Sequence, residues 1–204
     1  MSHTPSVDPD LESQVLGLAR RAREASRRMG ELGTHDKNAW LLRAAERLEA
    51  AKATILAANA EDVKAAQAAG LEAPLLGRLA LSDAKWRDMI SGLRDVAALP
   101  DPVGEIVDSK VRPNGLRVGR MRIPLGVILI IYEARPNVTV DAAALCVKAG
   151  NAVILRGGSE AIRANRALGE ELRAAARETG VPEDAIVVVP TTDRAALEPL
   201  LRAD

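Results

Sequence analysis

Apolar side chains recur at helical spacing through the first hundred residues of the chain. Their pattern predicts amphipathic helices over residues 11–29 and 38–59, with a continuation over residues 60–69. A third long helix is expected between a Ser82 cap and Pro100. Trp40 and Trp86 fall on apolar stripes of these helices, so we expect both to be core anchors rather than ligand-stacking groups. Residues 1–104 are therefore expected to form a helical arm that packs on the rest of the chain.

The period changes from helical to alternating between residues 105 and 123. Two alternating runs flank Asn114-Gly115, a dipeptide that favours a two-residue turn because both positions tolerate positive φ. The segment is predicted to be a β-hairpin, and neither of its faces is cleanly apolar. It could be a ribbon that reaches a partner chain or another domain, or an ordinary surface hairpin.

From residue 124 onward the pattern predicts strand, helix, strand, helix, strand, helix. The strands are GVILII, AVIL and AIVVV, and the helices span about 138–149, 159–179 and the last residues. This order is typical of a parallel sheet with right-handed crossovers, which makes the fold class α/β. The first strand is continuously apolar and is expected to be buried on both faces. The third strand is expected near an exposed edge, because a doubly wound sheet usually has more strands.

Composition and charge narrow the function classes. The chain has 204 residues, 28 Lys plus Arg against 28 Asp plus Glu, and three aromatic residues. A neutral chain with few rings does not suit binding to nucleic acid. One cysteine and two histidines exclude an internal disulfide framework and a metal site built from Cys or His. Without a secretory signal or a membrane-length apolar run, the chain is expected in the cytoplasm and away from membranes.

The first candidate site is Arg156-Gly157-Gly158-Ser159-Glu160, at the carboxyl end of the second parallel strand. Open α/β sheets bind ligands at this edge, and a helix N-terminus favours anions. Arg156 could hold a phosphate, and Glu160 could accept hydrogen bonds from ribose hydroxyls. The usual Rossmann and P-loop glycine motifs do not occur, and the glycines could simply form a tight turn.

The second candidate site follows the first parallel strand, at residues 132–137. Asn137 could donate its amide to a developing oxyanion, or it could cap the helix that follows. Cys146 is the only thiol, and it lies inside a predicted helix without a neighbouring base. We therefore expect a buried structural cysteine and no catalytic nucleophile in these residues.

Two long sequence segments resemble those of a known family: YEARPNVTVDAAALC and KAGNAVILRGGSEA. With RPNGLRVGRMRIPLG and TTDRAAL, they make the chain from about residue 8 to 204 resemble the γ-glutamyl phosphate reductases (glutamate-5-semialdehyde dehydrogenases). Leu129 departs from the pattern, because the family usually has Gly there, and its bulk could crowd neighbours or a ligand.

The resemblance implies an aldehyde dehydrogenase-like fold and an oxidoreductase of proline biosynthesis. Such an enzyme reduces L-glutamate 5-phosphate with NADPH to L-glutamate 5-semialdehyde, through a cysteine thioester and with release of phosphate. Residues 124–204 would be the first part of the NADP-binding domain, leaving its Rossmann-like sheet incomplete. Residues 105–123 would be an oligomerisation ribbon. The catalytic domain and its nucleophile would lie outside the chain.

By the same resemblance, Arg156, Gly157, Gly158, Ser159 and Glu160 lie where the cofactor ribose binds, and an arginine there suits the 2′-phosphate of NADPH. Asn137 becomes the candidate oxyanion donor, and Arg135 a candidate for gripping the phosphate or carboxylate of the substrate. No metal is implied.

The resemblance also implies a homo-oligomer and an association with glutamate 5-kinase. The alternatives are a non-catalytic interaction module that uses the arm and hairpin, or another aldehyde dehydrogenase-like enzyme. We expect these residues alone to be inactive and to bind NADPH weakly or not at all.

Overall fold

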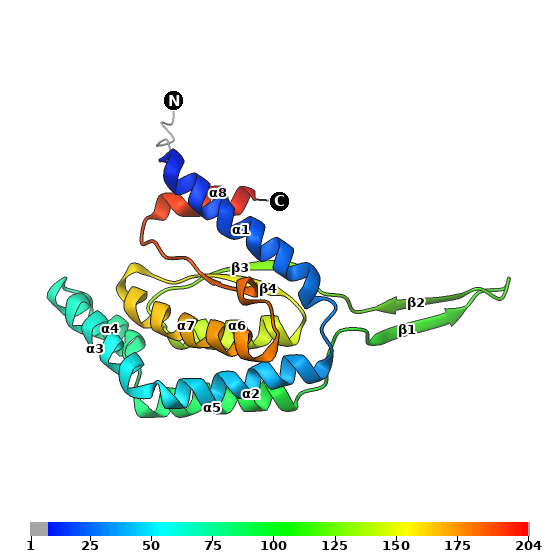
Figure 1. The fold of residues 1–204 in the computed structure, drawn as a ribbon, viewed down its shortest axis with the longest axis horizontal. Coiled ribbons are helices and arrows are strands. Elements are labelled where there is room, and N and C mark those ends of the chain that lie inside the picture. Colours follow the sequence, from blue (N-terminus) through cyan, green and yellow to red (C-terminus); the bar gives the residue numbers. More distant parts are fainter. Residues whose placement is uncertain (1–7, 204) are drawn as a thin grey trace.

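The computed structural model describes residues 8–203 and arranges them as helical layers around a small parallel sheet, with a hairpin projecting from the body (Figure 1). Five helices precede the first strand: α1 (Pro9–Met29), α2 (Thr34–Ala50), α3 (Lys52–Ala68), α4 (Ala73–Leu79) and α5 (Asp83–Ala98). Side-chain caps fix the N-termini of α1 and α5. The Asp8 side chain accepts a hydrogen bond from the backbone N–H of Asp10, and the Ser82 side chain accepts one from Lys85.

The predicted helix over residues 38–59 with its continuation is wrong in one respect, because the structure breaks it at Ala51. Alanine is a good helix former, so nothing local signals the break. The reason is tertiary. Helix α2 packs on α5 and α7, whereas α3 packs on α7 and on the short helix η1 (Ser159–Ala161) after β4. The break therefore brings α3 to the candidate site.

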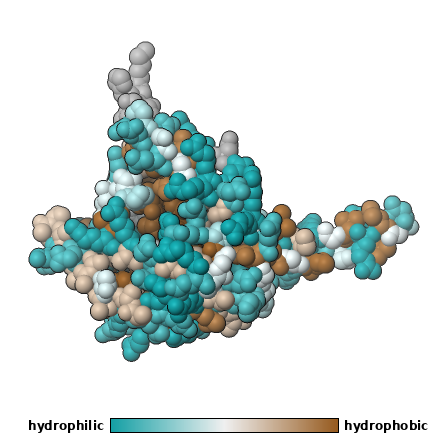
Figure 2. Space-filling model, in the orientation of Figure 1, coloured by the Kyte–Doolittle hydropathy of each residue, from teal (hydrophilic) through white to brown (hydrophobic). Residues whose placement is uncertain are grey.

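The predicted hairpin is present as antiparallel strands β1 (Ile106–Val111) and β2 (Arg117–Met121). Gly115 takes a φ of +84°, as the turn requires, and the Asn114 side chain accepts a hydrogen bond from the N–H of Leu116. Every residue of both strands is exposed. Figure 2 shows apolar residues along the projecting hairpin, which include Ile106, Val111 and Met121.

The parallel sheet has the order β3-β4-β5, formed by β3 (Val127–Ile131), β4 (Ala152–Arg156) and β5 (Ile186–Val188). Helices α6 (Asn137–Lys148) and α7 (Ile162–Thr179) lie on one side, while α1 and α8 (Leu197–Arg202) lie on the other (Figure 1). Strand β4 is buried throughout. The expectation that the first strand is buried on both faces is wrong: β3 is half-buried and Ile131 is exposed, because β3 is an edge strand. Strand β5 is also at an edge, yet Ile186 and Val187 are buried.

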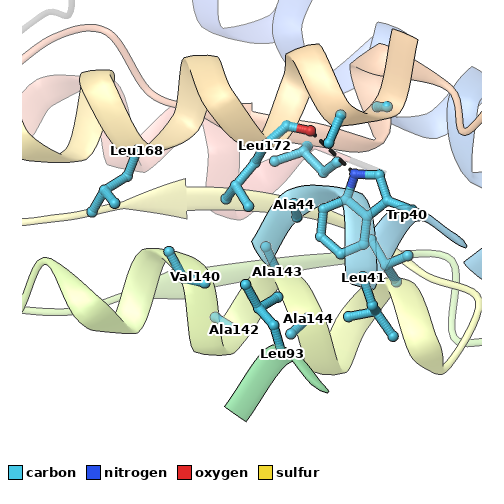
Figure 3. Close-up of a cluster of buried hydrophobic side chains, with 14 of the residues drawn as sticks. Trp40, Leu41, Ala44, Leu93, Val140, Ala142, Ala143, Ala144, Leu168 and Leu172 are labelled. Atoms are coloured by element: carbon cyan, nitrogen blue, oxygen red, sulfur yellow. Dashed lines mark hydrogen bonds between the residues drawn. The ribbon is translucent and has the colours of Figure 1, made fainter. Parts of the chain in front are cut away.

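The helical arm is joined to the sheet layer by a core in which Trp40 is central (Figure 3). Trp40 is fully buried, and its Nε1 donates a hydrogen bond to the backbone oxygen of Leu172 at 3.1 Å. Trp86 is 3% exposed and belongs to the same cluster. Both tryptophans are therefore core anchors, as the sequence predicts. The arm and the sheet share this apolar interior. A separate small cluster of Ala66, Leu79, Ala134 and Ala161 packs α3 and α4 against the loops after β3 and β4.

Candidate functional site

The turn after β4 is built around two glycines that have no room for a side chain. A Cβ on Gly157 would collide with the amide of Asn165 on α7, and a Cβ on Gly158 would collide with the carboxylate of Glu160. The predicted helix over residues 159–179 is in fact the short helix η1 followed by α7. The glycines thus let the chain pass close to α7 before the helix begins.

A carboxylate from the helical arm fixes the start of α7. Asp62 on α3 is 1% exposed and accepts hydrogen bonds from the N–H of Ala164 at 2.8 Å and from Nη1 of Arg163 at 3.1 Å. It satisfies backbone donors that a helix start leaves unpaired. Asp62 is not among the residues that the sequence predicts for the site. The available signal was a carboxylate on the same helical stripe as Ile55, Asn59 and Ala66, all of which are buried.

The two candidate segments are joined directly. Oε1 of Glu160, in the turn after β4, accepts a hydrogen bond from the N–H of Ala134, in the loop after β3, at 2.6 Å. The structure therefore brings together the two loops that the sequence places at the ends of separate strands. Parallel strands end at the same edge of a sheet, which explains the meeting.

A second connection runs beneath the loops, through side chains that are mostly buried. The hydroxyl of Thr139 on α6 donates to Oδ1 of Asn165 at 3.0 Å. Its oxygen then accepts from the hydroxyl of Tyr132, 2.6 Å away. Burial raises the pKa of Tyr132 to about 12, although the hydrogen bond with Thr139 opposes the shift. Tyr132 is therefore neutral at physiological pH and acts as a donor in this chain of hydrogen bonds.

Arg156, at the end of β4, is 7% exposed and donates through Nη2 to the backbone oxygen of Thr192 at 3.1 Å. Its Nε is buried and has no hydrogen-bond partner among the described residues. An unpaired buried donor is costly, and a bound anion would satisfy it. Arg156 lines a cavity of about 500 Å³, which we call the β4 hollow. Its walls are formed by Leu71, Leu75, Ile131, Tyr132, Glu133, Ala134, Arg156, Gly158, Ser159, Glu160, Arg194 and Leu197.

A neighbouring cavity of about 460 Å³, the β3 hollow, shares part of this wall. It is lined by Leu75, Arg78, Ile131, Tyr132, Glu133, Ala134, Arg135 and Val138. Arg135 and Glu133 are exposed here, and Arg78 comes from α4. Arg135 is the residue that the sequence resemblance suggests for binding the phosphate or carboxylate of the substrate. The sequence gives no comparable signal for Arg78, because α4 is a short helix far away in the chain.

Asn137 does not line either hollow. The interpretation that it caps the following helix is wrong: it is the first residue of α6, where Pro136 holds the cap position in a helical conformation, and no side-chain cap bond forms. Its Nδ2 instead donates to Oδ2 of Asp141 at 3.1 Å. This bond uses one of the two N–H donors of the amide, so the second donor is not committed to Asp141.

Cys146 and Leu129, which the sequence also singles out, lie away from the loops after β3 and β4. Cys146 is 5% exposed, and burial raises the pKa of its thiol to about 11, so it is not a thiolate at neutral pH. Leu129 lines a cavity beside α1 and packs against a cluster that includes Ile154 and Leu200. Its bulk is accommodated on the α1 side of the sheet, and it lines neither the β3 nor the β4 hollow.

Comparisons with known proteins agree on the relatives of this chain. The aldehyde dehydrogenase family model matches residues 7–204. A curated γ-glutamyl phosphate reductase from Moorella thermoacetica is 57% identical over 194 residues, which cover 95% of this chain and 46% of the relative. One from Persephonella marina is 54% identical over 195 residues, covering 96% of this chain and 44% of the relative. The chain spans about half the length of these curated relatives.

Solved structures show the same similarity. The γ-glutamyl phosphate reductase of Thermotoga maritima has a TM-score of 0.89 and 41% identity, covering 92% of this chain and 45% of that protein. The one from Saccharomyces cerevisiae has a TM-score of 0.82 and 31% identity, covering 87% of this chain and 46% of that protein. Within residues 8–203, no helix is long and apolar enough to cross a membrane.

Proposed function

The chain belongs to the aldehyde dehydrogenase family, and from that premise we propose that it serves the NADPH-dependent reduction of L-glutamate 5-phosphate to L-glutamate 5-semialdehyde in proline biosynthesis. The observation that carries the proposal is identity of more than half the aligned residues with curated γ-glutamyl phosphate reductases. The two adjoining hollows add physical support, because a reductase of this kind needs a cofactor and a substrate side by side.

In this proposal the β4 hollow receives the cofactor. Arg156, Gly158, Ser159 and Glu160 line it. Gly157 does not line it, but its lack of a side chain lets the turn pack against Asn165. The unpaired Nε of Arg156 suits the 2′-phosphate that distinguishes NADPH from NADH. The free oxygen of Glu160 would accept from ribose hydroxyls while its partner oxygen holds Ala134. NADPH would supply the hydride for the reduction.

The β3 hollow would receive the substrate, with Arg135 positioned for one of its anionic groups. Phosphate would leave when a cysteine thiolate attacks the acyl group and forms a thioester, but Cys146 cannot supply that thiolate because it is buried and protonated. We therefore propose that these 204 residues alone do not catalyse the reduction. Asn137 stays a candidate oxyanion donor, through the amide N–H that does not bond Asp141.

We further propose assembly through the hairpin, in a homo-oligomer and in association with glutamate 5-kinase. Support comes from the exposed apolar residues along both strands. A cytoplasmic location suits the single free thiol, which a reducing compartment preserves.

A chimera tests the function. This chain would replace the matching part of the Moorella thermoacetica reductase, and NADPH oxidation would be followed with L-glutamate 5-phosphate generated in the assay. We expect the chimera to turn over and to release one phosphate per NADPH, while the 204-residue chain alone does not. A folded but inactive chimera beside an active parent enzyme would contradict the proposal and favour an interaction module. Oxidation of aldehydes without reduction of the acyl phosphate would instead indicate another aldehyde dehydrogenase-like activity.

A further inference from the structure

Two arginines from distant parts of the chain converge on the β3 hollow. Arg78 lies in the last turn of α4, and Arg135 lies in the loop after β3. Both are exposed, and neither has a hydrogen-bond acceptor or a carboxylate partner among the described residues. Guanidinium groups bind carboxylates and phosphates through paired N–H donors. The hollow therefore presents two guanidinium groups that are free to bind an anion.

The position of Arg78 is fixed by a neighbouring lysine. Nζ of Lys85 donates to the backbone oxygens of Gly77 at 2.7 Å, Arg78 at 2.9 Å and Ala80 at 2.8 Å, which ties down the end of α4. Burial lowers the pKa of Lys85, and the charge of Arg135 lowers it further. Lys85 and Arg135 thus lie close enough for their positive charges to interact.

One carboxylate, that of Glu133, shares the hollow with the two arginines. Its presence decides which anion fits. A phosphate dianion beside Glu133 would meet a like charge, whereas an α-amino acid carries a carboxylate for the arginines and an ammonium for the glutamate. Two positive groups and one negative group match the zwitterionic end of an amino acid.

The two hollows share a wall formed by Leu75 and residues 131–134. A molecule whose amino-acid end lies at Arg78 can extend its side chain over Tyr132 and Ala134 toward the β4 hollow.

We propose that the β3 hollow recognises the α-carboxylate of an L-glutamate derivative with Arg78 and Arg135, and its α-ammonium with Glu133. The identity of the amino acid rests on the proposed function, whereas the binding geometry rests on the three side chains. Arg78 is then a specificity-determining residue that selects an amino-acid substrate over a simple aldehyde or acyl phosphate.

The test is direct binding to the 204-residue chain, measured by two-dimensional NMR titration with L-glutamate, glutarate and inorganic phosphate. We expect millimolar binding of L-glutamate, weakened roughly tenfold by Arg78→Gln and by Arg135→Gln. Arg28→Gln, which removes an exposed arginine that lines neither hollow, leaves binding unchanged. Circular dichroism checks that each variant is folded. We expect all of them to fold, because the substituted side chains are exposed.

Glu133→Gln separates the ammonium contact from general charge. It should weaken L-glutamate binding and strengthen glutarate binding, because glutarate has no ammonium and suffers only repulsion from the carboxylate. The proposal is overturned if L-glutamate does not bind, if Arg78→Gln behaves like Arg28→Gln, or if phosphate binds more tightly than L-glutamate. Because no turnover is measured, these outcomes are distinct from an inactive chimera, which bears on the proposed function instead.

Discussion

The loops that follow β3 and β4 end at the same sheet edge but are held in different ways. The loop after β4 leads into α7, whose start is held by the buried carboxylate of Asp62, and its Gly157 packs against Asn165. The loop after β3 keeps Glu133 and Arg135 exposed, and their charged groups have no hydrogen-bond partner among the described residues. The loop after β4, which we call the cradle, is therefore preorganised, whereas the loop after β3 presents free charges to a ligand.

The largest effect is expected at the carboxylate beneath the cradle. Asp62→Ala removes the acceptor for the N–H of Ala164 and leaves that buried donor unpaired, so we expect a loss of about 3 kcal/mol in the free energy of unfolding. Urea denaturation measures it. Glu61→Ala, at the exposed neighbouring position, should change stability by less than about 0.5 kcal/mol. Equal effects of the two variants would show that the cradle is not held from below.

Glycine substitutions probe how tightly the cradle is packed. Gly157→Ala places a Cβ against the Asn165 amide, and we expect a loss of about 2 kcal/mol in unfolding free energy. Gly77→Ala on α4 is the matched control. Its Cβ would meet nothing within 4 Å, and a helical Ala should add about 0.5 kcal/mol. The comparison fails if both substitutions change stability in the same direction.

Tyr132 links the loop after β3 to α6 and α7, and its removal should have a smaller effect. Tyr132→Phe deletes one hydroxyl of the Tyr132–Thr139–Asn165 chain, so we expect a loss of about 1 kcal/mol at neutral pH. Folding raises the pKa of the phenol from 10.0 to about 12, so its contribution is complete below pH 10.0 and is lost as pH rises to about 12. Urea titrations across this range should show a steeper fall for the parent chain than for Tyr132→Phe. Parallel curves would mean that Tyr132 titrates normally.

The smallest effect is expected at the thiol that belongs to neither loop. Cys146 is buried and its pKa is raised to about 11, so iodoacetamide should scarcely label the native chain at neutral pH. Labelling should become rapid in urea, as mass spectrometry can follow. Rapid labelling of the native chain would contradict this and make Cys146 a candidate nucleophile.

The regular elements around the site are largely predictable from the sequence. Apolar runs locate all three parallel strands, and Asn114-Gly115 locates the hairpin turn. These features depend on residues that are close in sequence. The break at Ala51 is not predictable in this way, because it serves contacts with a helix more than a hundred residues later.

The site is less predictable than the fold, for the same reason. The position of Arg156 after β4 follows from periodicity, but its burial and its contact with Thr192 do not. Asp62 and Arg78 join the site only through tertiary packing of α3 and α4. The half-exposed state of β3 likewise depends on which strands pair, which hydrophobicity alone does not reveal.

The central claim, that the two loops serve different ligands, is tested most directly by crossed kinetics in the chimera with the Moorella thermoacetica reductase. Arg156→Gln and Arg135→Gln would each be assayed while NADPH and L-glutamate 5-phosphate are varied separately. We expect Arg156→Gln to raise KM for NADPH roughly tenfold and to leave KM for L-glutamate 5-phosphate unchanged, whereas Arg135→Gln does the reverse. If both variants raised the same KM, or if each raised both equally, the assignment of one loop to each ligand would be contradicted.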